Sequence, residues 1–394
     1  MAASSPTMSD HLGMFALLWL DLVLEILYRL PVKSLLTLKC VCKPLNSITS
    51  YPNFAKDHLR LSRTCHYHLV LCQMRYFSET DFIHFDYLLP TVFDNSTAST
   101  TIIPETILEF PLNPSKNRSV IFGSCNGIIC FKTIDNNNNH VDLVVWNPCI
   151  RKFKILPPLE NLPKATYKSG HYNIGYDGFS DNYKVVAVTY QQFNRSNFFS
   201  KTLFRVHTLG TNFWKTIPGF PSKSMGEPYQ PQGVFVCDTI NWVIRPYQKN
   251  GHSWVILSLN LGSESYNEIS QPDYGLDKPL CNLNLEVSRN CLYVLAHTKT
   301  FIETWVMKDY GKKDSWTKLF TVPFVKFVGY RDPVNMLCIG EEDDQVWLAI
   351  DLKVYLYNYK NGTIKSLNIQ GLPSKSFDFN LSISNVYIES LVSP

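Results

Sequence analysis

A helical repeat of apolar residues near the start of the chain constrains its fold most strongly. The apolar residues spaced at i, i+3 and i+4 along one helix face are Leu22, Val23, Ile26, Leu27 and Leu30. Pro31 has no backbone N–H and disfavours the helical conformation in the residue before it, so the helix is predicted to end there. Shorter helices are predicted from Lys33 to about Cys42 with Ser34 as a candidate cap, over Leu45–Ser50, and as a final turn over Phe54–Leu59.

This unit carries more apolar side chains than one small core can enclose, because a chain of roughly 40 residues buries little surface. The apolar residues are Leu22, Leu24, Ile26, Leu27, Leu30, Val32, Leu35, Leu36, Leu38, Val41 and Leu45. Part of the stripe is therefore expected either to bind a partner helix or to pack as a cap on the rest of the same chain. The pattern alone leaves both readings open.

After the helical unit, the apolar pattern changes to the alternation of strands, and the 13% aromatic content agrees with a strand-rich fold. Strands are predicted at residues 66–74 and 81–88. Asn126-Gly127 between two apolar runs predicts a β-hairpin, and Asn147-Pro148 predicts a turn between two further strands.

A weak internal repeat consists of a strand, a polar turn and an aromatic or branched residue that opens a return strand. The equivalent positions are Trp214, Tyr266, Trp316 and Ile364, at intervals of 52, 50 and 48 residues. A period near 50 is that of a β-propeller blade with four strands. Two more units, around Arg151 and around the early strands, bring the expectation to about six blades. An irregular β-sandwich with coincidental spacing is the alternative.

The last alternating segment, Leu381–Leu391, has the length of one strand, and no later segment is available to pair with it. A propeller leaves free sheet edges unless its first and last blades are joined. This segment is therefore predicted to pair with Tyr67–Met74 or Phe82–Tyr87 and to close the ring.

Composition narrows the functional classes. The 394 residues suggest two domains, and residues 1–15, rich in Ala, Ser and Met, are expected to be disordered. A net charge of +4 without a Lys/Arg block does not favour nucleic acid, and no apolar run is long enough to span a membrane. Eleven scattered cysteines without a CxxC pair predict reduced thiols in the cytoplasm or nucleus.

Three segments have partial signatures of catalytic or metal-binding chemistry, and the residues around them favour none of the three. Gly123-Ser124-Cys125-Asn126-Gly127 has the form of a hydrolase elbow, but the strand sequence after it favours a hairpin turn. His66 and His68, near Cys65 and Cys72, share one strand face without a second pair of ligands. The acidic run 341–344 lacks the spacing of a calcium loop. No phosphate loop is present, so the sequence predicts no catalytic, cofactor or metal site.

Two blocks resemble one family. EIL-x-RLPVKSLL-x-x-x-CVCK, starting at Glu25, resembles the F-box of plant F-box proteins. NGIICF, VVWNPCIRKFKILPP, GYDGFSDNYKVVAV and WVMKDYGKKDSWTKL resemble the F-box-associated domain of F-box/kelch-repeat and S-locus F-box proteins, although the kelch double glycine is absent. The resemblance covers about residues 18–388. Trp19-Leu20 and Pro44-Leu45 depart from the pattern. The first departure removes a helix start, and the second places a helix breaker and a smaller side chain in the third helix, so weaker binding to the adaptor of this family is expected.

The resemblance implies a mainly β fold with a small α domain, in which an N-terminal helical F-box precedes a β-propeller of about six blades. The expected boundaries are 1–15 for the disordered start, 16–60 for the F-box and 61–392 for the F-box-associated domain.

The function that the resemblance implies is a non-catalytic substrate receptor of an SCF-type ubiquitin ligase. The F-box would dock to a Skp-type adaptor, and through it to cullin and RING subunits, while the propeller would bind a target protein not identified by the sequence. The residues expected to dock are Leu22, Ile26, Leu30, Pro31, Val32, Leu35, Leu36, Val41 and Cys42. The alternative is a sugar- or small-ligand-binding propeller with a structural helical cap. An enzyme would need polar or metal-binding residues gathered in the central channel.

Overall fold

The fold was determined as a computed structural model of the whole chain. The residues that the structure describes are 20–61, 67–75, 82–88, 101–102, 106–112, 117–135, 140–159, 170–194, 197–219, 233–244, 254–275, 280–323, 335–339, 344–350, 353–369 and 379–394. The predicted disorder of residues 1–15 lies outside them. Within these ranges, no helix has the length and hydropathy to cross a membrane.

The described part of the chain begins with four helices, here called the helical module (residues 20–61). The first covers residues 20–28 as far as it is described, and the others are α2 (Val32–Leu38), α3 (Lys43–Ser50) and α4 (Pro52–Leu61). The first helix ends before Pro31, as the sequence predicts. The segment expected to form only a final turn is a complete helix, α4.

Two local predictions for the module are wrong. The N-cap of α2 is Pro31, whose carbonyl accepts a hydrogen bond from Leu35 N at 3.1 Å, so Ser34 lies inside the helix and does not cap it. Pro44 is the second residue of α3 and does not break it. A proline is tolerated in the first turn, where backbone N–H groups have no partner within the helix.

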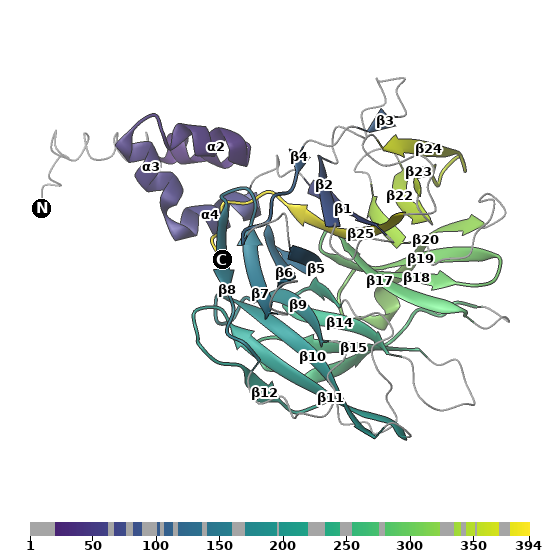
Figure 1. Cartoon of the computed structure of the whole chain (residues 1–394). Helices are drawn as coiled ribbons and strands as arrows, with labels where there is room; N and C mark the ends of the chain where they lie inside the picture. The colour runs from purple at the N-terminus through teal and green to yellow at the C-terminus, as the bar shows by residue number, and fades with distance from the viewer. Residues whose placement is uncertain are drawn as a thin grey trace, which may run out of the picture.

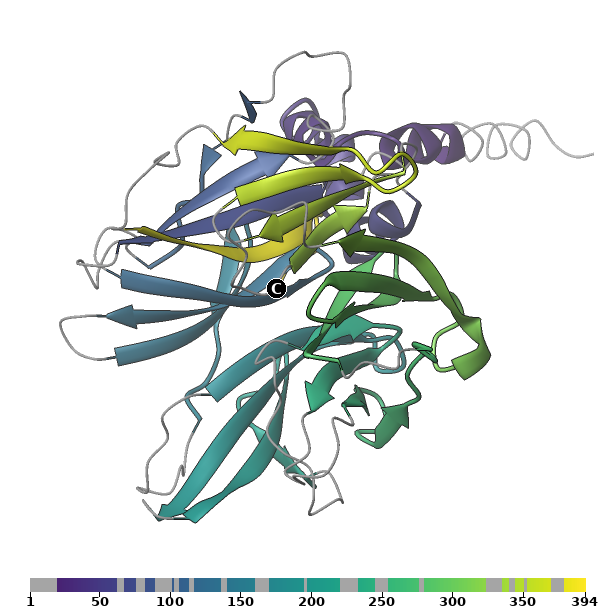
Figure 2. The ribbon, with the colours of Figure 1, turned by 90° about the vertical axis from the view of Figure 1, so that its right-hand side faces the viewer.

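The remaining described strands form six sheets, which are the blades of a propeller (Figures 1 and 2). Blade 1 contains, from the inner to the outer strand, β25 (Phe379–Ile388), β1 (Tyr67–Arg75), β2 (Phe82–Leu88) and β4 (Thr106–Ile107). Blade 2 contains β5 (Asn117–Cys125), β6 (Ile128–Asp135), β7 (His140–Asn147) and β8 (Lys152–Ile155). Blade 3 contains β9 (Gly170–Asp177), β10 (Asn182–Asn194), β11 (Asn197–Thr208) and β12 (Lys215–Ile217).

The other three blades repeat this antiparallel order. Blade 4 contains β13 (Val234–Val236), β14 (Thr239–Ile244), β15 (Val255–Asn260) and β16 (Tyr266–Ile269). Blade 5 contains β17 (Asn282–Ser288), β18 (Cys291–His297), β19 (Phe301–Met307) and β20 (Trp316–Pro323), with the 3-10 turn η1 (Lys313–Ser315) before β20. Blade 6 contains β21 (Asn335–Ile339), β22 (Gln345–Ile350), β23 (Lys353–Asn358) and β24 (Ile364–Ile369), and β3 (Thr101–Ile102) pairs with β24. The prediction of about six blades is confirmed.

The predicted repeat marks the outer strand of successive blades. Tyr266, Trp316 and Ile364 each begin an outer strand, and Trp214 immediately precedes one. Two of the indoles also join neighbouring blades: Trp214 Nε1 donates a hydrogen bond to Pro157 O, and Trp316 Nε1 donates one to Ser270 O, both at 2.8 Å. Each acceptor follows the outer strand of the preceding blade, so the aromatic residue connects outer strands as well as opening one.

The ring is closed by the last strand. β25 pairs antiparallel with β1, from Tyr67 opposite Ile388 to Arg75 opposite Phe379. The first and last segments of the propeller therefore form one sheet, in which β25 covers the edge of β1. The prediction that residues 381–391 return to the first strands is confirmed, with β1 as the partner.

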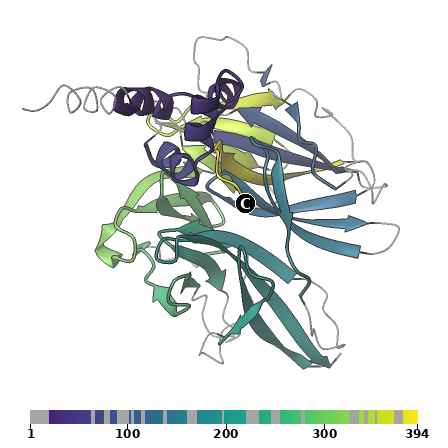
Figure 3. The ribbon, with the colours of Figure 1, turned by 90° about the vertical axis from the view of Figure 1, so that its left-hand side faces the viewer.

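The helical module packs on the end of the propeller that carries the β5–β6 and β9–β10 turns (Figures 1 and 3). One apolar cluster includes residues of the module, of blades 2 and 3, and of the C-terminus. Lys56 of α4 also pairs with Asp181 of the β9–β10 turn at 2.5 Å. Of the two readings of the apolar stripe, packing on the same chain is thus confirmed for part of it.

Candidate protein-docking surface on the helical module

The buried face of the module is built from three of its helices. Its buried apolar side chains are Leu27, Val32, Leu35, Phe54 and Ala55. Leu27 is the residue of the first helix that the 3.6-residue period directs inward, and α2 and α4 each supply two of the others. Tyr28 stacks on Phe54 with ring centroids 5.0 Å apart.

A buried histidine joins the two ends of the module. His58 Nε2 of α4 lies 2.8 Å from the carbonyl oxygen of Leu30, just after the first helix. The carbonyl can only accept, so the imidazole donates and supplies a partner for the helix end. Burial lowers the pKa of His58 although this hydrogen bond acts in the opposite direction, so the ring is neutral near pH 7.

Outside its buried face, the module exposes several large apolar side chains. Leu22 and Ile26 are 59% and 62% exposed, and Val41, between α2 and α3, is 66% exposed. Leu22 and Ile26 are four residues apart on one helix and thus share a face. The exposed apolar set, as named here, consists of Leu20, Leu22, Ile26, Val41 and Tyr51. Exposed apolar side chains grouped on one small module are typical of a protein-binding surface.

The nine residues predicted to dock divide into three groups by exposure. Leu22, Ile26, Val41 and Cys42 are exposed. Leu30, Pro31 and Leu36 are half-buried, and Leu30 and Leu36 pack against the core. Val32 and Leu35 are 2% and 0% exposed, so their side chains shape the module from within and are not accessible to a partner in this conformation.

Two further exposed residues, Leu20 and Tyr51, are not among the nine predicted to dock. Leu20 stands where the F-box pattern usually has an acidic residue. Tyr51 lies between α3 and α4, where no apolar period identifies a face. The signal available for Tyr51 was the Pro52 that follows it, because proline favours the first turn of a helix and places Tyr51 in the preceding connection.

The described residues of the three segments with partial catalytic or metal-binding signatures lie within the framework of the propeller. Cys125 is buried at the end of β5, where burial and the charge of Asp238 raise the pKa of its thiol, and Asn126-Gly127 forms the predicted hairpin turn. His68 lies in blade 1 with Asp86, Tyr387 and Glu389. Among the described residues, no three acidic, histidine or cysteine side chains are placed to hold a metal ion. The described ranges do not include Cys65, His66, residues 341–343 or the side chain of Cys72.

Fold and surface define a class: a closed six-bladed propeller that carries a small helical module with exposed apolar side chains. Comparison with known families supports this description for both the helical module and the propeller. Residues 20–57 match the F-box domain, and residues 73–394 match the F-box associated beta propeller domain. The chain therefore belongs to the family of F-box proteins with an F-box-associated β-propeller.

Curated relatives have the same organisation over nearly their full lengths. An F-box/kelch-repeat protein of Arabidopsis thaliana is 27% identical over 95% of this chain and 95% of its own. The F-box protein CPR1 of Arabidopsis thaliana is 25% identical over 94% of this chain and 88% of its own. Among solved structures, a chain of Kuenenia stuttgartiensis hydrazine synthase matches with a TM-score of 0.45 and 10% identity over 84% of this chain and 47% of its own, a likeness too distant to inform function.

Proposed function

We propose that this protein is the substrate-recognition subunit of an SCF-type E3 ubiquitin ligase. The helical module, an F-box, docks to a Skp-type adaptor, which links it to cullin and RING subunits in the cytoplasm or nucleus. The propeller binds a target protein. The protein acts by proximity and the transfer chemistry belongs to the other subunits, so this chain needs no catalytic group of its own.

The observation that carries this proposal is the division of apolar residues within the module. A structural cap would direct its large apolar side chains toward the propeller. Here Leu35 is fully buried, but Leu22 and Ile26 point away from the core and remain more than half exposed. Exposing large aliphatic side chains on a module already anchored to its own chain serves a partner.

The position of the module favours target binding at the opposite end of the propeller. The module packs beside the turn that joins β5 to β6 and beside Asp181 of the β9–β10 turn. The far ends of β6 and β7, at Asp135 and His140, lie at the other end of blade 2, because antiparallel neighbours connect alternately at the two ends. A target bound at that end leaves the adaptor surface unobstructed.

The experiment is a binding titration of the full chain against a plant Skp-type adaptor. Ile26→Asp is expected to weaken the adaptor complex by about a hundredfold or more, because an unpaired carboxylate in an apolar interface costs several kcal/mol. As Ile26 is exposed, the free protein should keep its circular dichroism spectrum and melting temperature. Leu30 and Leu36 are less suitable positions because they border the core.

A matched control is Asn53→Asp, which adds the same charge at an exposed position in the first turn of α4, where the helix dipole favours an acid. This variant is expected to bind the adaptor like the wild type. Wild-type affinity of Ile26→Asp would contradict the assignment of the docking surface. Absence of adaptor binding by the wild-type chain would contradict the proposed function itself.

A further inference from the structure

The six residues after β25 do not end free in solvent but lie between the propeller and the helical module. Residues 389–394 are here called the C-terminal tail. Ser390, Leu391 and Val392 are all buried. In Figure 1 the tail leaves β25 and reaches the C-terminus beside α4 and β8.

Hydrogen bonds fix the tail to blade 2. Asn147 Nδ2, at the end of β7, lies 3.0 Å from Ser390 O, 3.1 Å from Ser390 Oγ and 2.7 Å from Val392 O. Ser390 Oγ donates to Asn126 O in the β5–β6 turn at 2.7 Å. Asn147 is fully buried, so these bonds are shielded from water and hold the tail in one register.

The β5–β6 turn is shaped to receive the tail. Gly127 has φ +83°, and a Cβ at this position would lie 2.3 Å from Ser390 Oγ and 2.7 Å from Ile388 O. The Asn-Gly pair that predicts a hairpin therefore also provides the surface on which the tail lies.

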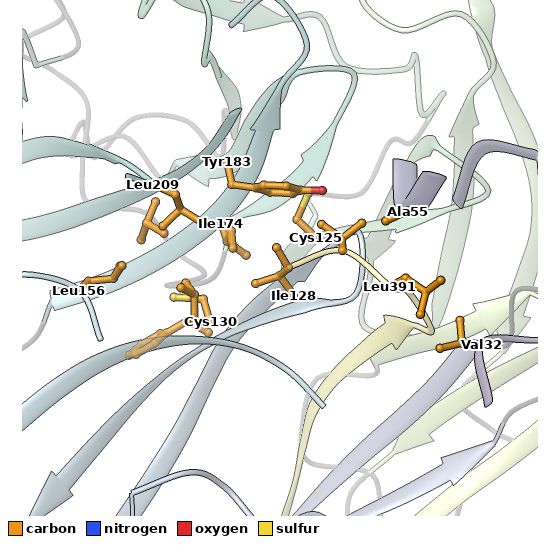
Figure 4. Packing of buried hydrophobic residues seen from close by; sticks show 14 of the residues in the cluster. Val32, Ala55, Cys125, Ile128, Cys130, Leu156, Ile174, Tyr183, Leu209 and Leu391 are labelled. Atoms are coloured by element: carbon orange, nitrogen blue, oxygen red, sulfur yellow. The ribbon is translucent and has the colours of Figure 1, made fainter. Parts of the chain in front are cut away.

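The other side of the tail contacts the helical module. Leu391 and Val392 belong to the same apolar cluster as Leu27, Val32 and Ala55 of the module. Figure 4 shows Leu391 beside Val32, with Ala55 above them and with Cys125 and Ile128 of the β5–β6 hairpin on the propeller side. The negative charge of Glu389 also favours the protonated form of His58 in α4 and so opposes the lowering of its pKa by burial.

A second connection, independent of the tail, lies at the β9–β10 turn. Lys56 Nζ of α4 is 2.5 Å from Asp181 Oδ2 and 6.0 Å from the ring centroid of Tyr176. Tyr176 OH donates a hydrogen bond to Asp181 as well. A partly exposed ion pair contributes little energy but adds a second fixed point, which opposes rotation of the module about the tail.

We propose that the C-terminal tail is an orientation lock, which fixes the exposed apolar set at one position relative to the propeller. The same chain end that closes the ring through β25 then anchors the adaptor-binding module through Leu391 and Val392. This inference rests on the proposed function: in a ligase that works by proximity, a fixed module gives a bound target a defined distance from the transfer machinery. Closure of the propeller and placement of the adaptor are thereby joined in one segment.

The experiment is hydrogen–deuterium exchange of the full chain carrying Leu391→Asp. A carboxylate in this apolar contact should release the module, so amide exchange in α2 and α4 is expected to rise at least about tenfold. Exchange in β14 and β15, on the far side of the ring, should be unchanged. Ser393→Asp is the matched control, because it adds the same charge two residues later at an exposed position, and it should exchange like the wild type.

Unchanged exchange in α2 and α4, or an equal rise with Ser393→Asp, would contradict the proposed orientation lock. An equal rise in β14 and β15 would also contradict it, because the tail would then support the whole ring. The double variant Leu391→Ala with Val392→Ala is a second test that adds no charge, and it should reproduce the local rise because both side chains belong to the shared apolar cluster. Adaptor titration separates the two proposals. Leu391→Asp should bind within about threefold of the wild type because the exposed apolar set is intact, whereas failure of every form to bind concerns the proposed function alone.

Discussion

The helical module and the propeller are stabilised by contacts of very different sequence range. Inside the module, Tyr28 stacks on Phe54 and His58 bonds to Leu30, so these internal contacts lie within about one module length. In blade 1 of the propeller, Tyr67 pairs with Ile388 and His68 contacts Glu389, across almost the whole chain. The internal contacts of the module are therefore local in sequence, whereas closure of the ring depends on one distant pairing, although the C-terminal tail connects the two regions.

The largest effect is expected from removing that distant pairing. A chain that ends at residue 378 lacks β25, leaves the edge of β1 unpaired and should aggregate on expression. A chain that ends at Ile388 keeps β25 and should remain soluble and monomeric. Size-exclusion chromatography and thermal melting compare the two. A monomeric 378-residue protein with the wild-type melting temperature would show that ring closure is not required for folding.

The contrast in contact range explains what the sequence predicted. Hairpins and helices are local, so the Asn126-Gly127 turn, the end of the first helix before Pro31 and the strands opened by Trp316 and Ile364 were all predictable. Closure by β25 was also predictable, because an unpaired last strand in a ring has few partners. The 50-residue period predicted the ring of blades, and hence its closure, even though the individual strands are short.

The sequence did not predict which apolar side chains of the module point inward and which are exposed. Val32 and Leu35 were grouped with Ile26 because all are apolar and belong to one motif, yet only Ile26 is exposed. The difference arises from the apolar cluster that Val32 and Leu35 share with Leu391 of the C-terminal tail, which is a tertiary property. The role of Asn147 was hidden for the same reason, since its partners Ser390 and Val392 are more than 240 residues away.

Two glycines test how far the distant contact constrains a local turn. Gly127 and Gly210 both have positive φ, but a Cβ at Gly210 would meet no atom within 4 Å. Gly210→Ala should therefore cost only the backbone strain, about 1 kcal/mol. Gly127→Ala should cost about 3 kcal/mol or more, because the tail must also move. Chemical denaturation of the two variants gives the difference, and equal losses would mean that the tail does not rest on this turn.

His68 in blade 1 should also make the propeller less stable at alkaline pH. Burial would lower the pKa of His68, but hydrogen bonds and charges of Asp86 and Glu389 outweigh it and raise the pKa to about 9. Protonated His68 thus stabilises the fold fully below its unfolded pKa of about 6.5, and the contribution is lost as pH rises through 9.

The expected loss between pH 7 and 10 is on the order of 2 kcal/mol, measured by urea denaturation across this range. His68→Gln should be less stable at pH 7 and should lose most of the alkaline decline. His58 serves as the comparison from the module. Its pKa is lowered, chiefly by burial, so a replacement there should alter stability toward acid pH and leave the alkaline decline in place. An undiminished decline in His68→Gln would assign it to other groups.

The smallest effect is expected at the position where sequence and structure disagree about the module. Pro44 was expected to disturb the third helix, but it occupies the first turn of α3, where its fixed φ suits the helix. Pro44→Ser should therefore change stability by no more than about 0.5 kcal/mol and leave adaptor affinity unchanged. Leu45→Trp is the contrasting variant: Leu45 packs against the core, so the larger ring should overfill it and cost about 1–3 kcal/mol. Tighter adaptor binding by Pro44→Ser would restore the view that this proline weakens the docking surface.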